Sequence, residues 1–197
     1  MKKLALTDFA KYRYPSALEL SPDSRYLTFA LKDVDREGDG YRWNLWLYDL
    51  ERRESRQITQ GDDQRKAVWE DNTHILYKTT EPDEALRARG FEEEWTVYHR
   101  LNVCTGEDRE AFRLPMSVSG LWKMDEGRYV FTGETHLDRP NLLELTGEAL
   151  EKELVRRQQT RGYKVLTELP LCENGVGMFN QTRNTLFLYL ETAGEYR

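Results

Sequence analysis

The sequence predicts an all-β fold: an incomplete β-propeller with about three four-stranded blades, the first hairpin of a fourth, and short helical insertions. Two observations lead to this prediction. A turn-and-strand motif recurs about every fifty residues, and the strands between its copies carry apolar side chains on both faces. Four-stranded units of this size, each needing a neighbour on either side, are typical of propellers.

Each copy of the motif is a turn of Pro, Asp, Asn, Ser or Gly that leads into a short run of β-branched and aromatic residues. Such a pattern is typical of a hairpin. The copies align on one aromatic position, occupied by Phe29, Tyr77, Phe131 and Phe187. The copy before Phe187, which begins at Phe179, is degraded. The motif therefore predicts the first hairpin of each blade.

A second motif lies between these copies. Residues 44–50 are a predicted strand, 51–54 a turn and 55–59 a return strand. The pattern recurs over 98–114, and a weaker copy starts at 141–145 before an insertion. Each unit thus holds two hairpins and four strands, which is the content of one propeller blade.

Both faces of the predicted sheets are apolar. Leu45 and Leu47 point to one face of their strand, and Trp46 and Tyr48 point to the other. Neither face is stable in water, so each sheet needs a flanking sheet on both sides. The alternative is an all-β sandwich in which the repeat is a coincidence, but a sandwich does not predict recurrence at a regular spacing.

The whole chain, residues 1–197, is expected to be one partial propeller domain. Its predicted blades cover 16–60, 61–115 and 116–173, with a half blade over 174–197. The half blade would leave a strand edge unpaired, whereas propellers protect their edges by closing the ring. We therefore expect a truncated chain.

Two helical insertions are predicted. Residues 82–90 begin with proline and end with glycine, as helices commonly do. Residues 148–160 place Ala149, Leu150, Leu154 and Val155 on one side of a charged helix. Both insertions are expected on the rims of the ring.

Charge and motifs exclude several classes of function. The net charge is -6 with interspersed signs, so a nucleic-acid partner is not expected. No apolar run is long enough to span a membrane, and the apolar run at the N-terminus ends too early for a signal peptide. Cys104 and Cys172 lie far apart without a CxxC motif, which predicts reduced core cysteines in a cytoplasmic protein. No motif predicts a cofactor or a metal site.

The residues resemble those of a known family. Residues 14–16 followed by 20–29 look like the opening blade of the S9 serine peptidases, which include prolyl oligopeptidases and acylaminoacyl-peptidase-like enzymes. Residues 44–49 and 56–59 are similar to a strand pair of that family. A later propeller segment is matched by Leu169-Pro170, Glu173-Asn174-Gly175, Arg183 and residues 186–189. The sequence departs from the common pattern at Ser24, where glycine is usual.

The resemblance implies a parent enzyme in which a propeller of roughly seven blades caps a C-terminal α/β-hydrolase domain and admits only short peptides. That domain would carry a Ser-Asp-His triad with its serine on a GxSxG turn. No GxSxG occurs in this chain, and the nearest phrase, residues 117–120, lacks the first glycine. We therefore expect the hydrolase domain to be absent and the chain to hold no catalytic residue.

The expected partners are the remaining blades, the hydrolase domain and, in the parent enzyme, short peptide substrates. The alternative is a stand-alone propeller, similar to TolB or WD proteins, that acts as a protein-interaction module. The Ser-Pro-Asp motif at residues 21–23 is shared with TolB-like propellers and does not separate the two.

One cluster is a candidate substrate-binding site. Glu92, Glu93 and Glu94 precede the predicted strand 96–100. Some dipeptidyl-peptidase relatives hold the free amino terminus of a substrate with propeller glutamates, because paired carboxylates bind an ammonium group. The alternative is that these glutamates are a solvated rim of the sheet.

Overall fold

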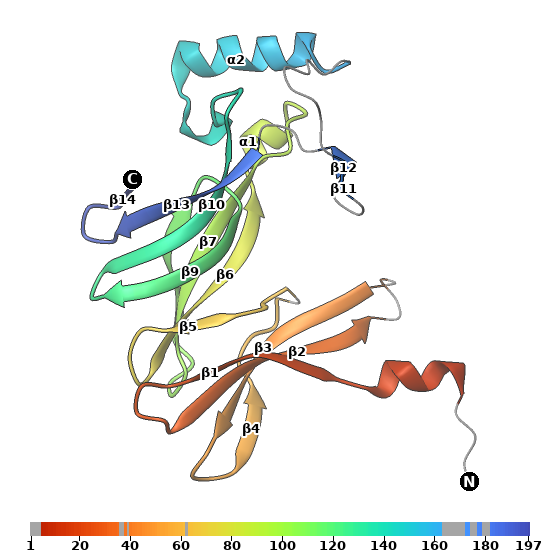
Figure 1. The fold of residues 1–197 in the computed structure, drawn as a ribbon, viewed down its shortest axis with the longest axis vertical. Coiled ribbons are helices and arrows are strands. Elements are labelled where there is room, and N and C mark those ends of the chain that lie inside the picture. The colour runs from red at the N-terminus through yellow and green to blue at the C-terminus, as the bar shows by residue number, and fades with distance from the viewer. Residues whose placement is uncertain are drawn as a thin grey trace. The chain divides into compact units, whose positions relative to one another are not determined.

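The computed structural model describes residues 5–35, 38, 40–61, 63–162, 172–173, 177–178 and 182–197. Within these residues the strands form three four-stranded sheets and one two-stranded sheet (Figure 1). The first sheet has the order β1 (Tyr14–Leu20), β2 (Tyr26–Asp35), β3 (Gly40–Asp49) and β4 (Glu54–Gln57). The second has the order β5 (Ala67–Trp69), β6 (His74–Pro82), β7 (Glu94–Asn102) and β8 (Asp108–Leu114).

The third four-stranded sheet has an interrupted order along the chain. Its strands are, in spatial order, β14 (Glu195–Tyr196), β13 (Thr182–Leu190), β10 (Arg128–His136) and β9 (Val118–Asp125). The two-stranded sheet pairs β11 (Cys172–Glu173) with β12 (Gly177–Met178). The helices are two 3-10 helices, Leu6–Lys11 and Leu142–Glu144, and two α-helices, α1 (Glu84–Arg87) and α2 (Gly147–Gln159).

Three consecutive four-stranded sheets confirm the predicted fold class, an incomplete β-propeller. The chain divides into two compact units. The first contains Met1–Thr80, Val97–Arg113 and Trp122–Gly127, and the second contains Glu81–Thr96, Leu114–Leu121 and Arg128–Arg197.

The first repeat motif forms the predicted hairpin turn. The Ser21 hydroxyl donates to Asp23 Oδ1 over 2.6 Å and accepts the backbone N–H of Tyr26 over 2.9 Å. Ser24 has a φ of 60°, in the left-handed region that favours glycine. This conformation explains why glycine is usual at that position in the resembling family.

The prediction that residues 174–197 begin a fourth blade is wrong. β13 pairs with β10 along its whole length, so that Phe187 lies opposite Phe131, and β14 pairs with β13. Residues 182–196 are therefore the third and fourth strands of the third sheet, and residues 137–181 are inserted between its second and third strands. The start of the degraded motif copy, residues 179–181, lies outside the described residues. The weaker copy over 141–145 is not a strand but contains the 3-10 helix.

The same pair of neighbouring strands carries a ring stack in each sheet. Phe29 stacks on Trp46 with centroids 6.5 Å apart. Tyr77 stacks on His99 at 5.1 Å, and Phe131 stacks on Phe187 at 5.1 Å. Such cross-strand pairs stabilise a sheet. They also show that Phe187 corresponds to Trp46 in the repeat, not to Phe29.

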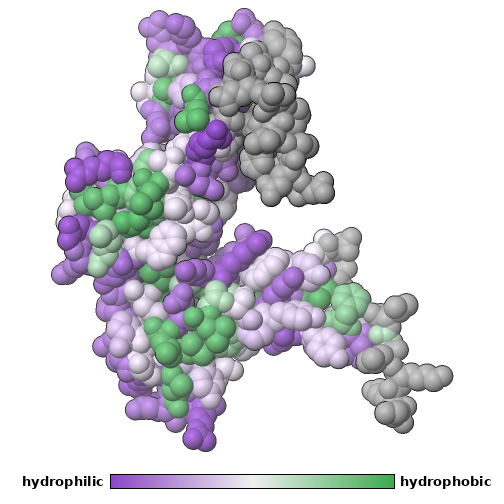
Figure 2. All heavy atoms as spheres, viewed as in Figure 1, coloured by the Kyte–Doolittle hydropathy of each residue, from purple (hydrophilic) through white to green (hydrophobic). Residues whose placement is uncertain are grey.

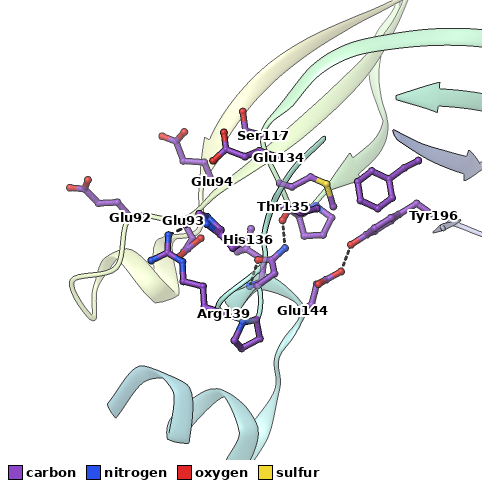
Figure 3. Close-up of a pocket in the computed structure, with 16 residues that line it drawn as sticks. Glu92, Glu93, Glu94, Ser117, Glu134, Thr135, His136, Arg139, Glu144 and Tyr196 are labelled. Atoms are coloured by element: carbon purple, nitrogen blue, oxygen red, sulfur yellow. Dashed lines mark hydrogen bonds between the residues drawn. The ribbon is translucent and has the colours of Figure 1, made fainter. Parts of the chain in front are cut away.

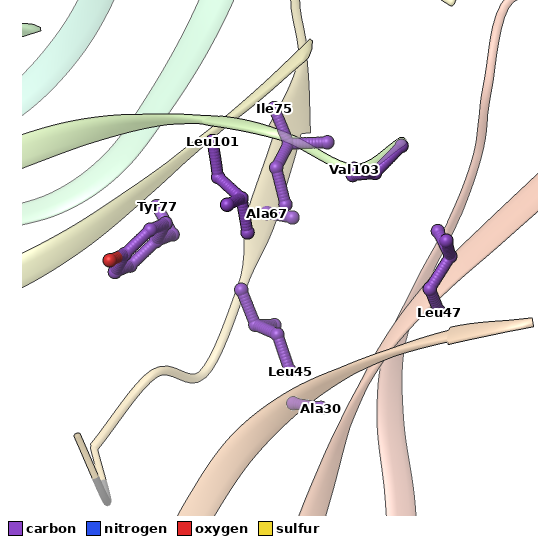
Figure 4. Packing of buried hydrophobic residues seen from close by; sticks show 8 residues of the cluster. All are labelled: Ala30, Leu45, Leu47, Ala67, Ile75, Tyr77, Leu101 and Val103. Atoms are coloured by element: carbon purple, nitrogen blue, oxygen red, sulfur yellow. The ribbon is translucent and has the colours of Figure 1, made fainter. Parts of the chain in front are cut away.

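Each unit has its own apolar core. In the first unit, side chains from β2 and β3 meet side chains from β5, β6 and the end of β7 (Figure 4). The second unit has a smaller cluster, formed by Leu86 of α1, Leu142 of the second 3-10 helix and Leu154 of α2, with Phe91 packed against it.

The predicted helices are present, with differences in detail. α1 is shorter than the predicted 82–90 and is capped by Asp83, whose Oδ1 accepts the N–H of Leu86 over 3.0 Å. In α2, Leu154 is buried as expected, but Val155 is exposed. Cys104 is exposed in the turn after β7, so its expected place in the core is wrong. The side chain of Cys172 lies outside the described residues.

Candidate functional site

A cavity of about 520 Å³ in the second unit is lined by all three predicted glutamates, Glu92, Glu93 and Glu94 (Figure 3). The remaining lining comes from the segment after β8, the end of β10, the turn that follows it, and the last sheet strands. These residues are Pro115, Met116, Ser117, Glu134, Thr135, His136, Arg139, Pro140, Asn141, Leu143, Glu144, Phe187 and Tyr196. The cavity gives the three glutamates a shared location, while a binding role for them stays a prediction.

The α1 turn positions the glutamates. Asp83 caps the helix, accepts the indole N–H of Trp95 at Oδ2 over 3.1 Å, and donates its backbone N–H to the carbonyl of Glu93 over 2.9 Å. Gly90, with a φ of 83°, reverses the chain after the helix. One carboxylate thus fixes both ends of the loop that leads into β7.

Glu93 is the least available of the three carboxylates. Its Oε1 accepts a hydrogen bond from Arg157 Nη1 over 2.7 Å, and the Arg157 side chain is only 11% exposed. Arg157 also contacts Glu153 in its own helix and the carbonyl of Pro140. This arginine therefore joins α2 to the loop before β7, and leaves Glu92 and Glu94 as the exposed carboxylates of the predicted cluster.

A fourth carboxylate, Glu134, lines the cavity from the end of β10. Its backbone N–H donates to the carbonyl of Ser117 over 2.9 Å, and its side chain is exposed. The sequence does not single out Glu134, because nothing in its local pattern relates it to residues 92–94. To predict that Glu134 lies near Glu94, one would need to know how β10 is placed beside the start of β7.

The opposite end of the cavity is aromatic and hydrogen-bonded. Tyr196 donates its hydroxyl proton to Glu144, and its ring meets Phe187 edge-on at 5.5 Å (Figure 3). Burial, and then the hydrogen bond to Glu144, raise the pKa of Tyr196, so the phenol keeps its proton at neutral pH. Asn141 caps the adjoining 3-10 helix by accepting the N–H of Leu143 over 3.1 Å.

The lining of the cavity carries a net negative charge. His136 Nε2 lies 3.1 Å from Arg139 Nη2, and burial followed by the charge of Arg139 lowers the pKa of His136. The imidazole is therefore neutral at pH 7, and among the lining residues five glutamates oppose one arginine. Such a site attracts a cation, and two neighbouring carboxylates suit an ammonium group.

A second cavity, of about 410 Å³, lies in the first unit and was not predicted. Its lining mixes Arg25, Arg52 and Arg56 with Asp49 and Glu54. Cys104 Sγ lies 3.8 Å from the hydroxyl of Tyr26 at its edge. Three arginines and two carboxylates line this cavity, so charges of both signs nearly balance there.

The other two histidines lie in structural hydrogen bonds. His74 contacts Asp71 through Nδ1 at 2.9 Å, and His99 Nε2 lies 3.0 Å from Thr79 Oγ1. Within the part of the chain that the structure describes, no group of three or more His, Cys, Asp or Glu side chains is arranged to hold a metal. No helix in that same part combines the length and apolarity needed to cross a membrane.

No family model and no curated protein matches this sequence. Solved structures, in contrast, do match it. An acylaminoacyl peptidase from Pyrococcus horikoshii matches 95% of this chain and 25% of its own, with a TM-score of 0.63 and 13% identity. An acylaminoacyl peptidase in complex with Z-Gly-Gly-Phe-chloromethyl ketone matches 96% of this chain and 25% of its own, with a TM-score of 0.61 and 12% identity.

This is the fold of acylaminoacyl peptidases over a quarter of their length. The isopeptidase AtxE2 is also similar, with a TM-score of 0.52 and 13% identity over 93% of this chain and 29% of its own. At these identities the likeness concerns the fold alone, and it confirms the fold that the sequence resemblance implied. The chain spans about a quarter of the length of the acylaminoacyl peptidase chains that it matches.

Proposed function

We propose that this chain is the non-catalytic propeller portion of an S9-family serine peptidase, and that it gates the access of short peptides to a hydrolase domain outside these residues. The observation that carries the proposal is the match of 95% of the chain to an acylaminoacyl peptidase. The sequence motifs at 20–29 and 44–59 support the same family independently of the fold.

The proposed gating is a matter of size and charge. Propeller blades are rigid sheets, so the space they enclose has a fixed width that excludes large substrates. The acidic cavity adds a preference, because Glu94 and Glu134 attract the ammonium group of a peptide with a free amino terminus. The alternative, that these glutamates only keep the rim hydrated, predicts no such preference.

The coding sequence that flanks codon 197 tests the family assignment. We expect it to continue in frame into further blades and an α/β-hydrolase domain with a GxSxG serine. A stop codon directly after Arg197 in the intact genome would contradict the proposal. The purified chain alone should not turn over acyl-peptide or prolyl-peptide reporter substrates, and turnover would contradict the non-catalytic role.

Peptide titration tests the cavity. We expect a short peptide with a free amino terminus to shift the NMR signals of residues around Glu94 and Glu134, and its N-acetylated form to shift them at least tenfold less. The double variant Glu94→Gln/Glu134→Gln should lose the shifts. Glu107→Gln, an exposed glutamate in the first unit, is the matched control. Equal responses to both peptides would support the hydrated-rim alternative.

A further inference from the structure

One side of α2 is buried, and it carries charged side chains as well as leucines. The residues of this helix that are not exposed recur every three or four positions, which places them on one side: Leu150, Glu153, Leu154 and Arg157. The surface over α2 in Figure 2 is mostly hydrophilic. The two leucines pack in the small apolar cluster of the second unit. An arginine in the same row is costly unless its donors find partners.

Each nitrogen of the Arg157 guanidinium has a partner. Nη1 donates to Glu93 Oε1 over 2.7 Å, and Nη2 donates to the carbonyl of Pro140 over 2.6 Å. Nε donates to Glu153 Oε1 over 3.1 Å. The guanidinium is therefore fixed by the loop before β7, by the turn after β10 and by its own helix.

Glu153 does not depend on Arg157 for a partner. The neighbouring Arg156 donates to both oxygens of Glu153, over 2.7 Å and 2.6 Å. A buried ion pair adds little net stability compared with apolar residues of the same volume. The charge at position 157 is therefore explained better by its effect on Glu93 than by the stability of α2.

That effect concerns the charge that the cavity presents to a ligand. Residues 92–94 bring three consecutive carboxylates to the lining, and Arg157 compensates the middle one. Glu92 points away from Glu134 in Figure 3, whereas Glu94 lies on the same side of the cavity as Glu134. The exposed carboxylates of Glu94 and Glu134 form one pair, and one such pair suits one ammonium group.

We propose that Arg157 is a positioning residue that withholds Glu93 from the cavity, so that the site accepts one ammonium group and not two. The inference rests on the proposed function, because it concerns the same site. It narrows the ligand to a peptide with a free amino terminus and an uncharged first side chain. A lysine or arginine in first place brings a second positive charge, for which the compensated Glu93 offers no partner.

Two nearly isosteric peptides test the proposal: norleucyl-phenylalanine amide and lysyl-phenylalanine amide, which differ by one positive charge. NMR titration gives the ratio of their dissociation constants for each variant. Arg157→Gln should raise the preference for the lysyl peptide about fivefold, the effect of one uncompensated charge at roughly 8 Å in a hydrated site. Arg157→Lys, which keeps the charge, should stay within about twofold of the unmodified chain.

A double variant separates the effect of charge from a structural role. Glu93→Gln/Arg157→Gln lacks the contact but also lacks the freed carboxylate, so its ratio should return to that of the unmodified chain. If Arg157 only holds α2 in place, the double variant should differ from the unmodified chain as much as Arg157→Gln does. Arg89→Gln, which frees the exposed Glu151 of α2 outside the cavity lining, is the matched control and should not change the ratio.

Two results would overturn the role of Arg157: an unchanged ratio in Arg157→Gln, or a double variant that keeps the raised ratio. Circular dichroism checks that each variant folds, and Arg157→Met, which keeps an unbranched apolar stem, replaces Arg157→Gln if the glutamine unfolds the chain. Failure of both peptides to bind the unmodified chain is a different result. It would reject the proposed amine site together with this inference, whereas an unchanged ratio rejects the inference alone.

Discussion

The first and third sheets have equivalent strand pairings, but opposite faces of the two sheets are buried. In the first sheet the face with Leu45 is buried, while the face with Phe29 is partly exposed. In the third sheet Tyr129 and Phe131 are 1% and 0% exposed, while Leu186 on the other face is largely exposed. The difference shows that the residue pattern makes both faces suitable for packing, and that the neighbours of a sheet decide which face is used.

The largest expected effect is at the aromatic position that the two sheets share. Phe131→Ala should lower the free energy of unfolding by about 4 kcal/mol, because it leaves a cavity in a fully buried site. Phe29→Ala should cost about half as much or less, since that side chain is already partly in water. Urea denaturation followed by fluorescence measures both values, and equal losses would contradict the difference between the faces.

For the leucines on the other face, the larger loss of stability is expected in the first sheet and the smaller one in the third. Leu45→Ala should cost about 3 kcal/mol, because it empties the junction between the first two sheets. Leu186→Ala should change the free energy of unfolding by less than about 0.5 kcal/mol, since its side chain is exposed. Urea denaturation measures both variants. A loss above about 2 kcal/mol at Leu186 would show that its face is covered within the chain.

The insertion between the strands of the third sheet, which has no counterpart of its length in the first sheet, is tied to the loop before β7 by a polar contact. Arg157→Leu should cost about 2 kcal/mol, because it removes the partner of the partly buried Glu93, whereas Glu153 keeps its contact with Arg156. Arg89→Leu, which removes an exposed pair with Glu151, is the control and should cost less than about 1 kcal/mol. Thermal unfolding compares the two variants, and equal shifts would mean that burial of Arg157 adds nothing.

The smallest effect is a dependence on pH. Hydrogen bonds, first from Arg156 and also from Arg157, outweigh burial and lower the pKa of Glu153 below its usual 4.5. The ionised carboxylate of Glu153 therefore contributes stability that is complete above about pH 5. This stability is lost as the pH falls through the lowered pKa of the folded state. Glu153→Gln should show a shallower loss of stability than the unmodified chain between pH 5 and pH 3. Parallel curves would show that Glu153 has the same pKa folded and unfolded.

Much of the fold could be predicted from local patterns. The turn at Ser21–Tyr26 and the strand Asn44–Leu50 are recognisable because turn chemistry and alternation act over a few residues. The error at the C-terminal end has a clear cause. Leu186-Phe187-Leu188-Tyr189 matches Leu45-Trp46-Leu47-Tyr48, but an insertion separates it from its own hairpin partner, so that it resembles the start of a new hairpin like the Phe29 motif. The matching tetrapeptide is the signal that places it correctly.

The candidate site is less predictable from the sequence, because it depends on contacts between residues that lie far apart in the chain. Glu92, Glu93 and Glu94 form a visible run, but the residues that decide their properties come from distant parts of the chain. Arg157 neutralises Glu93 from α2, and Glu134 joins the cavity from the end of β10. Neither contact follows from spacing or composition, because the first depends on how the insertion folds back beside the loop before β7 and the second on how β10 lies beside that loop.

The insertion between β10 and β13 also affects when the third sheet can form. In the first sheet the corresponding strands are joined by residues 36–39, whereas in the third they are joined by residues 137–181. Closing the longer loop costs about 2 kcal/mol more in chain entropy. It also postpones the pairing until β13 and β14 have been synthesised. We therefore expect the first sheet to form early during translation, with β9 and β10 held as an incomplete hairpin until β13 and β14 emerge from the ribosome.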